Sequence, residues 1–329
     1  MTAPLRMVFA RDGWERVKHS LDQNAIEPVL IEPDGTTTFA GKSVDLAETG
    51  FTASWFSPDF FMLRQDQLFL DQMVASTTLR WMQAGRAGYD DPAFGKLAAK
   101  GVKISMSNAP AAAIGEYVIA AALDQLQRGP ERRAAQAERR WQSFPFREIA
   151  RTRWLCIGYG EIGRNVAQRA RALGAHVTGV RRSGGSDAHA DKMVTPEMSA
   201  AALASADVVV LSVPLTPEND GTYDAAFFGG FKPGTLFINV GRGQLLDEAA
   251  LKAALDSEQV GHAVLDVTRV EPLPADEWHW VHPKVTLTGH TAALGSGLMD
   301  RTDAILVDNV ARYLSGSPLM LELDPKVFA

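Results

Sequence analysis

The sequence predicts an α/β protein with two doubly wound parallel sheets, one of them in a domain inserted into the other. The first observation is length, because 329 residues suffice for about two domains at the usual ~150 residues each. The second is a rhythm of short apolar runs separated by helical stretches, which is typical of parallel sheets covered by helices. The third is a break near residue 110, where a long Ala-rich stretch precedes a new series of strands.

The first hundred residues alternate short strands with helices. Strands are expected at Leu5–Phe9, Pro28–Ile31, Phe51–Phe56, Leu79–Gln83 and Val102–Met106. Helices are expected at Gly13–Asp22 and Asp66–Val74. Strands that are spaced by helices predict a parallel sheet with helices on both faces.

A second and more regular series follows the Ile114–Gln127 helix. Its strands are expected at Trp154–Ile157, His176–Val180, Val208–Val213, Leu236–Val240, Ala263–Val267 and Val285–Thr288. The amphipathic stretch Leu298–Leu314 is expected to return to the first domain as a helix. The predicted domains are therefore residues 1–110 with 293–329, and residues 111–292, the second binding a nucleotide.

Charge and cysteine content exclude several classes of protein. The net charge is -6 and the isoelectric point about 5.7, which argues against binding to nucleic acid or to an acidic membrane. No stretch of ~20 uncharged apolar residues predicts a membrane span, and the apolar run Met7–Ala10 is too short for a secretory leader. The single Cys156 allows neither a disulfide nor a thiolate metal cage, so we expect a cytoplasmic protein without a metal.

An arginine-dense stretch runs from Arg128 to Arg153 and is interleaved with glutamates. Such a stretch could be a nucleic-acid-binding arm. Because the chain is acidic overall, we favour a solvated helix face or a contact between subunits.

A glycine-rich turn predicts a dinucleotide site. The run Gly158-Tyr159-Gly160-Glu161-Ile162-Gly163 follows an apolar strand and opens a helix, which is the context that the G-x-G-x-x-G pattern requires. The first glycine permits the tight turn, the second lets a pyrophosphate approach the backbone, and the third lets helix and strand pack closely. The pyrophosphate would lie on free N–H groups at the start of the helix.

The end of the next strand predicts which dinucleotide is bound. Arg181 and Arg182 lie roughly 20 residues after the glycine turn, where the residue that reads the ribose is expected. Two guanidinium groups suit the 2′-phosphate of NADP, and no carboxylate appears before Asp187. We therefore favour NADP over NAD, and the alternative is a pair of surface arginines beside a permissive pocket.

Three short motifs each follow a predicted strand. They are Asn239-Val240-Gly241-Arg242-Gly243, Asp266-Val267 with Glu271-Pro272, and Thr288-Gly289-His290-Thr291. In open α/β sheets, ligands bind at the carboxyl ends of strands. Arginine, glutamate and histidine together suit the reduction of a 2-oxo acid, since they can bind a carboxylate, donate a proton and orient the proton donor. Taken singly, Arg242 could be a loop salt bridge and Glu271 a solvated turn residue.

The segment from Trp154 to about Leu314 resembles the D-isomer-specific 2-hydroxyacid dehydrogenase family, particularly its glyoxylate/hydroxypyruvate reductase-like members. The resemblance extends along Val213-Pro214-Leu215-Thr216-Pro217, Lys232-Pro233-Gly234 and Asn239–Leu255. It implies a Rossmann nucleotide-binding domain inserted into a flavodoxin-like substrate domain, and it implies a homodimer. Our own candidate for the contact between the two subunits is the arginine-dense stretch.

The resemblance also implies roles for individual residues. The implied catalytic residues are Arg242, Glu271 and His290. The implied cofactor contacts beyond the glycine turn and the two arginines are Ser212, Val213, Pro214, Val240 and Asp266. Asp266 would contact the nicotinamide, and Ser212 to Pro214 would border the adenosine end. The implied substrate contacts are the loop Arg86-Ala87-Gly88 together with Arg242 and His290.

We therefore predict an NADP-preferring reductase of a small 2-oxo acid such as glyoxylate or hydroxypyruvate, with the corresponding 2-hydroxy acid as the other substrate. His290 would be the general acid, oriented by Glu271, while Arg242 binds the substrate carboxylate. One alternative is a phosphite-type dehydrogenase on the same scaffold, because that reaction uses the same three residues. The other is a non-catalytic dinucleotide-sensing protein.

Overall fold

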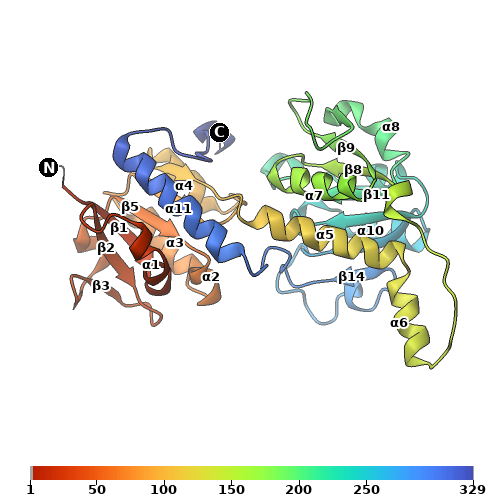
Figure 1. Ribbon diagram of the computed structural model, residues 1–329, viewed down its shortest axis with the longest axis horizontal. Helices are drawn as coiled ribbons and strands as arrows, with labels where there is room; N and C mark the ends of the chain where they lie inside the picture. The colour runs from red at the N-terminus through yellow and green to blue at the C-terminus, as the bar shows by residue number, and fades with distance from the viewer. Residues whose placement is uncertain (1–2, 329) are drawn as a thin grey trace. The chain divides into compact units, whose positions relative to one another are not determined.

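The computed structural model describes residues 3–328 and divides the chain into two compact units (Figure 1). Unit 1 contains the residues up to Pro110 and those from Ser296 onward, and unit 2 is Ala111–Gly295. Each unit is a mostly parallel sheet with helices on both faces, so the predicted α/β fold class is confirmed.

Within the described residues, unit 1 contains a seven-stranded sheet in the order β4-β3-β2-β1-β5-β6-β7. Its strands are β1 Leu5–Ala10, β2 Ile26–Ile31, β3 Thr37–Phe39, β4 Lys42–Ser43, β5 Ala53–Phe56, β6 Trp81–Ala84 and β7 Lys103–Ser105. The five parallel strands alone have the order 2-1-3-4-5 of a flavodoxin-like sheet.

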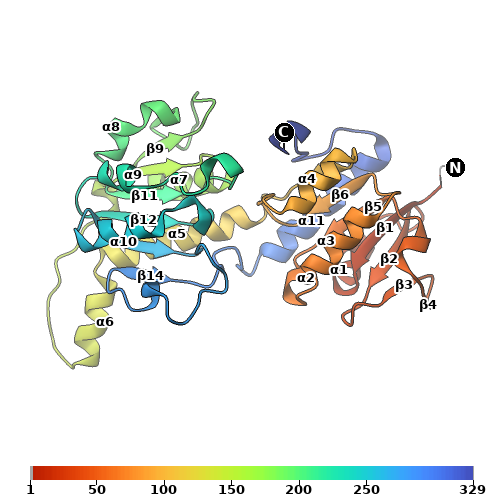
Figure 2. The same ribbon diagram turned by 180° about the vertical axis from the view of Figure 1, so that it is seen from behind.

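Helices cover both faces of this sheet (Figures 1 and 2). Helices α1 Arg11–Val17 and α11 Leu298–Ser315 bury Val17, Leu306 and Val310 against one face. Helices α2 Asp59–Met62, α3 Asp66–Ala75 and α4 Pro92–Ala99 bury phenylalanines and leucines against the other.

The hairpin β3–β4 was not predicted, and it makes one edge of the unit 1 sheet antiparallel. Its strands are short and partly exposed, so they lack the apolar run on which the prediction relied. The turn glycines Gly35 and Gly41 flank β3, both with positive φ, and they were the available signal for the hairpin.

The predicted helix Gly13–Asp22 is also wrong in extent, since α1 ends at Val17 and a 3₁₀ turn follows it.

The described part of unit 2 holds a seven-stranded parallel sheet in the order β10-β9-β8-β11-β12-β13-β14. Its strands are β8 Arg153–Ile157, β9 His176–Val180, β10 Lys192–Val194, β11 Val208–Leu211, β12 Thr235–Asn239, β13 Val260–Leu265 and β14 Val285–Leu287. This is the strand order 3-2-1-4-5-6 of a Rossmann sheet with one strand added. The direction of winding reverses between β8 and β11, which is where such sheets bind their ligands.

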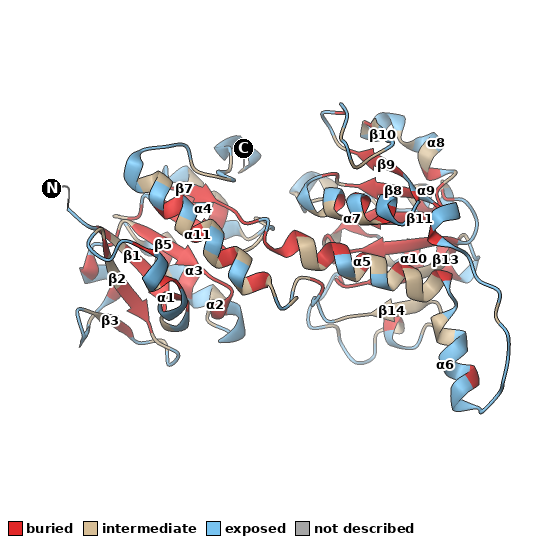
Figure 3. Ribbon diagram, viewed as in Figure 1, coloured by how far each residue is buried: buried red, intermediate tan, exposed pale blue. Residues whose placement is uncertain are grey.

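Two layers of helices cover the unit 2 sheet. Helices α5 Pro110–Leu126 and α7 Glu161–Ala172 lie on one face, and α8 Ala200–Leu203, α9 Ala225–Gly229 and α10 Glu248–Asp256 lie on the other (Figures 1 and 2). Figure 3 shows the inner strands of the sheet buried between these layers, whereas the edge strand β14 is of intermediate burial and α6 Gly129–Ala137 is mostly exposed.

Short 3₁₀ helices complete the chain at Lys18–Ser20, Leu46–Thr49, Ile149–Arg151, Pro196–Met198, Pro217–Asn219, Gly243–Leu245, Trp278–Trp280 and Pro325–Phe328.

Candidate active site

The glycine turn lies between β8 and α7, at the point where the winding of the sheet reverses. Gly158 has φ +88°, and a Cβ there would come 2.6 Å from the Val213 nitrogen, so this position requires glycine. A Cβ on Gly163 would come 2.7 Å from the Gly158 oxygen, because helix and turn are in close contact.

Gly160 differs from the two other glycines of the turn, since a Cβ there would meet nothing within 4 Å. Gly160 is also the N-cap of α7, and no side chain caps the helix there. The turn therefore presents open space in front of backbone N–H groups at a helix start, which fits the pyrophosphate of a dinucleotide. Glu161 and Ile162 form the first turn of that helix.

Tyr159 contributes its ring to the core, where it is 5% exposed. Its hydroxyl donates a hydrogen bond to Asp187 Oδ1 at 3.1 Å, and Arg164 lies 3.2 Å from the other oxygen. Burial alone would raise the pKa of Asp187. The hydrogen bonds from the His189 N–H and the Tyr159 hydroxyl, together with the Arg164 charge, outweigh burial and lower the pKa below its ordinary value.

Arg181 and Arg182 follow β9, at the carboxyl edge of the same sheet. The Arg181 guanidinium folds over its own loop, where Nε donates to the Gly184 oxygen at 2.6 Å and Nη2 to the Ser186 oxygen at 3.4 Å. Arg182 is exposed. Since a guanidinium has five N–H donors, these loop contacts leave Arg181 with donors for a further anion.

Ser212, Val213 and Pro214 follow β11, directly beside the glycine turn. The Ser212 hydroxyl donates to the Gly158 oxygen at 3.0 Å, and its N–H donates to the Ile157 oxygen at 2.8 Å. Val240, at the end of β12, is buried, and its N–H donates to the Leu211 oxygen at 3.0 Å. The predicted cofactor residues therefore lie on neighbouring strand ends.

The turn that carries Arg242 is held by the buried Asn239 side chain. Its Nδ2 donates to the Arg242 oxygen at 3.0 Å, and its Oδ1 accepts the Gly241 N–H at 3.0 Å. The half-buried Arg242 donates from Nη1 to the Gly241 oxygen at 2.8 Å. A Cβ on Gly243 would lie only 1.9 Å from the Thr268 carbonyl carbon, so this turn packs directly on the loop after β13.

His290 and Glu271 are hydrogen-bonded, with 2.8 Å between Nδ1 and Oε2. Glu271 Oε1 also accepts the Thr268 N–H at 3.0 Å. Burial raises the pKa of Glu271, but the hydrogen bonds with His290 and Thr268 and the charges of His290 and Arg242 outweigh it and lower the pKa below its ordinary value. The imidazole is 44% exposed, and Nε2 lies on the ring edge that faces away from Glu271.

Asp266 directly follows β13 and anchors the loop of His290, an arrangement that the sequence did not predict. Asp266 is buried, and its carboxylate accepts the N–H groups of Thr291 at 2.8 Å and Ala292 at 3.1 Å, together with the Thr288 hydroxyl at 2.6 Å. The Asp266 backbone oxygen accepts the His290 N–H at 2.8 Å. We call these hydrogen bonds of Thr288, His290, Thr291 and Ala292 with Asp266 the Asp266 cradle. The short polar residues around His290 in the sequence were the available signal for it.

The loop Arg86-Ala87-Gly88 follows β6 in unit 1. The Arg86 oxygen accepts the Ser107 N–H at 3.0 Å, and its guanidinium lies 5.4 Å from the Phe61 ring and 4.0 Å from Asp90. Ala87 is exposed and Gly88 half-buried.

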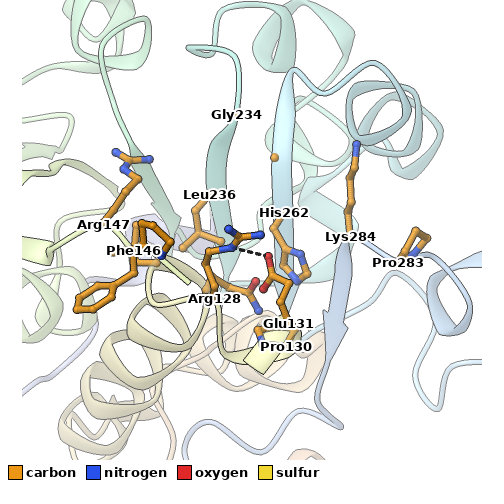
Figure 4. Close-up of a pocket in the computed structure, with 14 residues that line it drawn as sticks. Arg128, Pro130, Glu131, Phe146, Arg147, Gly234, Leu236, His262, Pro283 and Lys284 are labelled. Atoms are coloured by element: carbon orange, nitrogen blue, oxygen red, sulfur yellow. Dashed lines mark hydrogen bonds and ion pairs between the residues drawn. The ribbon is translucent and has the colours of Figure 1, made fainter. Parts of the chain in front are cut away.

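A separate hollow of about 710 Å³ lies at the opposite, amino edge of the unit 2 sheet (Figure 4). It is bounded by Gly234 and His262 at the starts of their strands and by Arg128 and Glu131 at the start of α6. Burial lowers the pKa of His262 to about 4, against the charges of Glu131 and Asp124, so this imidazole is neutral at pH 7. None of the predicted site residues is among those that line the hollow.

Residues 3–328 contain neither a membrane-spanning helix nor a cluster of metal ligands. No helix there is long and apolar enough to span a bilayer. No three histidine, cysteine, aspartate or glutamate side chains of this part gather as a metal-binding group.

Residues 119–292 match the model of the NAD-binding domain of D-isomer specific 2-hydroxyacid dehydrogenases. Glyoxylate/hydroxypyruvate reductase A of Serratia proteamaculans is 32% identical over 179 residues, which are 54% of this chain and 57% of that protein. The match thus spans little more than half the length of this relative.

Two solved structures resemble the whole chain. A D-isomer specific 2-hydroxyacid dehydrogenase family protein from Aeromonas salmonicida has a TM-score of 0.79 and 26% identity, covering 98% of this chain and 100% of its own. The NADPH-dependent glyoxylate/hydroxypyruvate reductase of Sinorhizobium meliloti, solved with NADP and sulfate, has a TM-score of 0.77 over 99% of this chain and 100% of its own. At 23% identity this second likeness shows the fold alone.

Proposed function

Because the chain belongs to the D-isomer specific 2-hydroxyacid dehydrogenase family, we propose that it is an NADP-preferring oxidoreductase that reduces a small 2-oxo acid. The proposed substrates are glyoxylate and hydroxypyruvate, and the reverse reaction oxidises the 2-hydroxy acid. The observation that carries the proposal is the His290–Glu271 pair, with 2.8 Å between Nδ1 and Oε2, at the carboxyl edge of a dinucleotide-binding type of sheet. The proposed dinucleotide-binding domain is residues 111–292, and the proposed substrate domain is residues 1–110 with 293–329.

The turn 158–163 would hold the pyrophosphate of the dinucleotide, because Gly160 leaves open space before the N–H groups of α7. Ser212, Val213, Pro214 and Val240 lie on the adjacent strand ends and would flank it. When bound, the dinucleotide supplies the hydride that reduces the substrate carbon.

The three proposed catalytic side chains would perform the remaining chemistry. Arg242 would bind the substrate carboxylate through two parallel N–H···O bonds. Glu271, whose lowered pKa keeps it ionised, holds Nδ1 of His290 and so orients the imidazole. His290 would then donate the proton on Nε2 to the substrate carbonyl oxygen, which becomes the hydroxyl of the product.

Steady-state kinetics on a set of substrates test this proposal. We expect the chain to consume NADPH with glyoxylate or hydroxypyruvate, and NADH less efficiently. Oxidation of phosphite with NADP and no reduction of 2-oxo acids would favour the phosphite-type reaction instead. Binding of NADPH without turnover of any substrate would favour a dinucleotide sensor and contradict the proposal.

The cofactor preference is tested at the end of β9. We expect the double substitution Arg181→Ala and Arg182→Ala to reduce the selectivity for NADPH over NADH by about tenfold or more, since charge-assisted bonds to a phosphate contribute roughly 1.5–3 kcal/mol. The measurement is kcat/KM for each dinucleotide. Lys192→Ala is the matched control, because it removes an exposed cation at the amino end of β10. An unchanged selectivity would overturn the NADP preference.

We also propose a homodimer that uses the arm formed by residues 128–153. Trp141 of this arm is fully exposed and Phe146 is 49% exposed, so the arm presents two large aromatic side chains that a second copy of the chain could cover. We expect a mass of twice 35.6 kDa for the wild type in light scattering, and a monomer for the double variant Trp141→Asp and Phe146→Asp. Met198→Asp, at another exposed apolar residue of unit 2, should leave the dimer intact. A dimeric double variant would place the contact elsewhere.

A further inference from the structure

A chain of hydroxyl groups connects helix α5 to the loop that carries His290. The Thr288 hydroxyl donates to Asp266 Oδ1 at 2.6 Å, and the Tyr117 hydroxyl lies 2.8 Å from the Thr288 oxygen. Because a threonine hydroxyl has a single proton, which goes to Asp266, the Tyr117 hydroxyl has to be the donor in the second bond. We call these two consecutive hydrogen bonds the hydroxyl relay. In it, Tyr117 donates to Thr288 and Thr288 donates to Asp266.

The Tyr117 hydroxyl is well suited to remain a donor. Burial raises the pKa of Tyr117 and the negative charge of Asp266 raises it further, against the opposing effect of the hydrogen bond with Thr288. The hydroxyl thus stays protonated throughout the neutral pH range.

Asp266 links this relay to the proposed proton donor. The same Oδ1 atom that accepts the Thr288 hydroxyl also accepts the N–H of Thr291 at 2.8 Å, and the backbone of Asp266 accepts the N–H of His290 at 2.8 Å. His290 lies between these contacts with φ +56°, in the left-handed region that few residues other than glycine adopt. The hydrogen bonds to Asp266 hold the loop in that conformation.

The hydroxyl relay also connects the segment by which the chain enters unit 2 to the segment by which it leaves. Tyr117 lies on α5, where the chain enters unit 2, and Thr288 lies shortly before the chain leaves it after Gly295. A Cβ on Gly295 would come 2.7 Å from the Ala113 Cβ, so the entering helix and the leaving segment are in contact inside unit 2. Tyr117 of α5 hydrogen-bonds to Thr288, two residues before His290.

We propose that Tyr117 is a positioning residue for His290, acting through Thr288 and Asp266 to keep the imidazole on Glu271. This inference rests on the proposed function for its catalytic consequence, but its structural consequence does not depend on turnover. Without the Tyr117 hydroxyl, the Thr288 oxygen lacks its donor, and only the bond to Asp266 then holds the Thr288 side chain in place. The loop would then hold His290 less firmly against Glu271.

A double-mutant cycle tests whether Tyr117 acts through Thr288. We expect Tyr117→Phe, which retains the ring, and Thr288→Val, which retains the shape, each to lower kcat by about tenfold with the KM for NADPH unchanged. The double variant should be no slower than either single one, and Thr288→Ser, which retains the hydroxyl, should restore kcat. Tyr313→Phe, at a half-buried tyrosine of unit 1, is the matched control and should be neutral.

A second readout requires no turnover. In the NMR spectrum of the wild type we expect a signal from the His290 Nδ1 proton bound to Glu271, assigned by its loss in His290→Asn. That signal should disappear or broaden in Tyr117→Phe and persist in Thr288→Ser and Tyr313→Phe. An unchanged signal in Tyr117→Phe, or additive effects in the cycle, would overturn the positioning role. A wild type that turns over no 2-oxo acid would instead overturn the proposed function, and the NMR comparison would still decide the inference.

Discussion

Replacing His290 by asparagine is expected to lower kcat for 2-oxo acid reduction by about 10²–10⁴-fold, because the general acid is lost from the reaction. The backbone should tolerate this change, since His290 has φ +56° and asparagine adopts the left-handed region more readily than most residues. Steady-state kinetics would show the loss in kcat, and fluorescence titration should show NADPH binding near the wild-type affinity.

His176→Asn is the matched control for this substitution. His176 is exposed at the start of β9, at the edge of the sheet opposite to His290, and its replacement should leave kcat unchanged. If His290→Asn turned over at the wild-type rate, the role of His290 as proton donor would be refuted.

The second large effect is expected from Gly243→Ala. An added Cβ would lie 1.9 Å from the Thr268 carbon, 2.2 Å from its oxygen and 2.3 Å from the Arg269 nitrogen, all of them backbone atoms that cannot rotate away. The loop after β13 must therefore move, and with it the Thr268 N–H that binds Glu271. We expect a loss of about 1–3 kcal/mol in the free energy of unfolding, the usual cost of overpacking, and a loss of most activity.

Thermal unfolding and kcat would be measured together for this variant. Gly229→Ala, at the end of α9, provides the control, since a Cβ there would meet nothing within 4 Å. Wild-type stability and activity in Gly243→Ala would contradict the close packing of the Arg242 turn on the Glu271 loop.

Much of the fold could be predicted because buried parallel strands are continuous apolar runs. The strand Val208–Leu211 is wholly buried and consists of valine and leucine alone, and His176–Val180 is buried after its first residue. The short strand β10 and the hairpin β3–β4 escaped prediction because they lie at sheet edges, where exposed residues such as Lys192 and Lys42 leave no apolar pattern.

The sequence could predict which residues of the candidate site come together, because each of them directly follows a predicted strand. Parallel strands bring the residues after β8, β11, β12 and β13 to one edge, so motifs far apart in sequence were expected near one another. Side-chain contacts were not predictable in this way. The Asp266 cradle depends on the path of the loop from Thr288 to Ala292, and the folding of Arg181 over Gly184 depends on its own loop.

The most direct test of the account is a crystal structure of the protein with NADPH and oxamate, a 2-oxo acid analogue that resists reduction. We expect the oxamate carboxylate on the Arg242 guanidinium and its carbonyl oxygen within hydrogen-bond distance of His290 Nε2, with the pyrophosphate on the turn 158–163. Oxamate or the dinucleotide bound away from these residues would contradict the central claim that Arg242, Glu271 and His290 form one catalytic site.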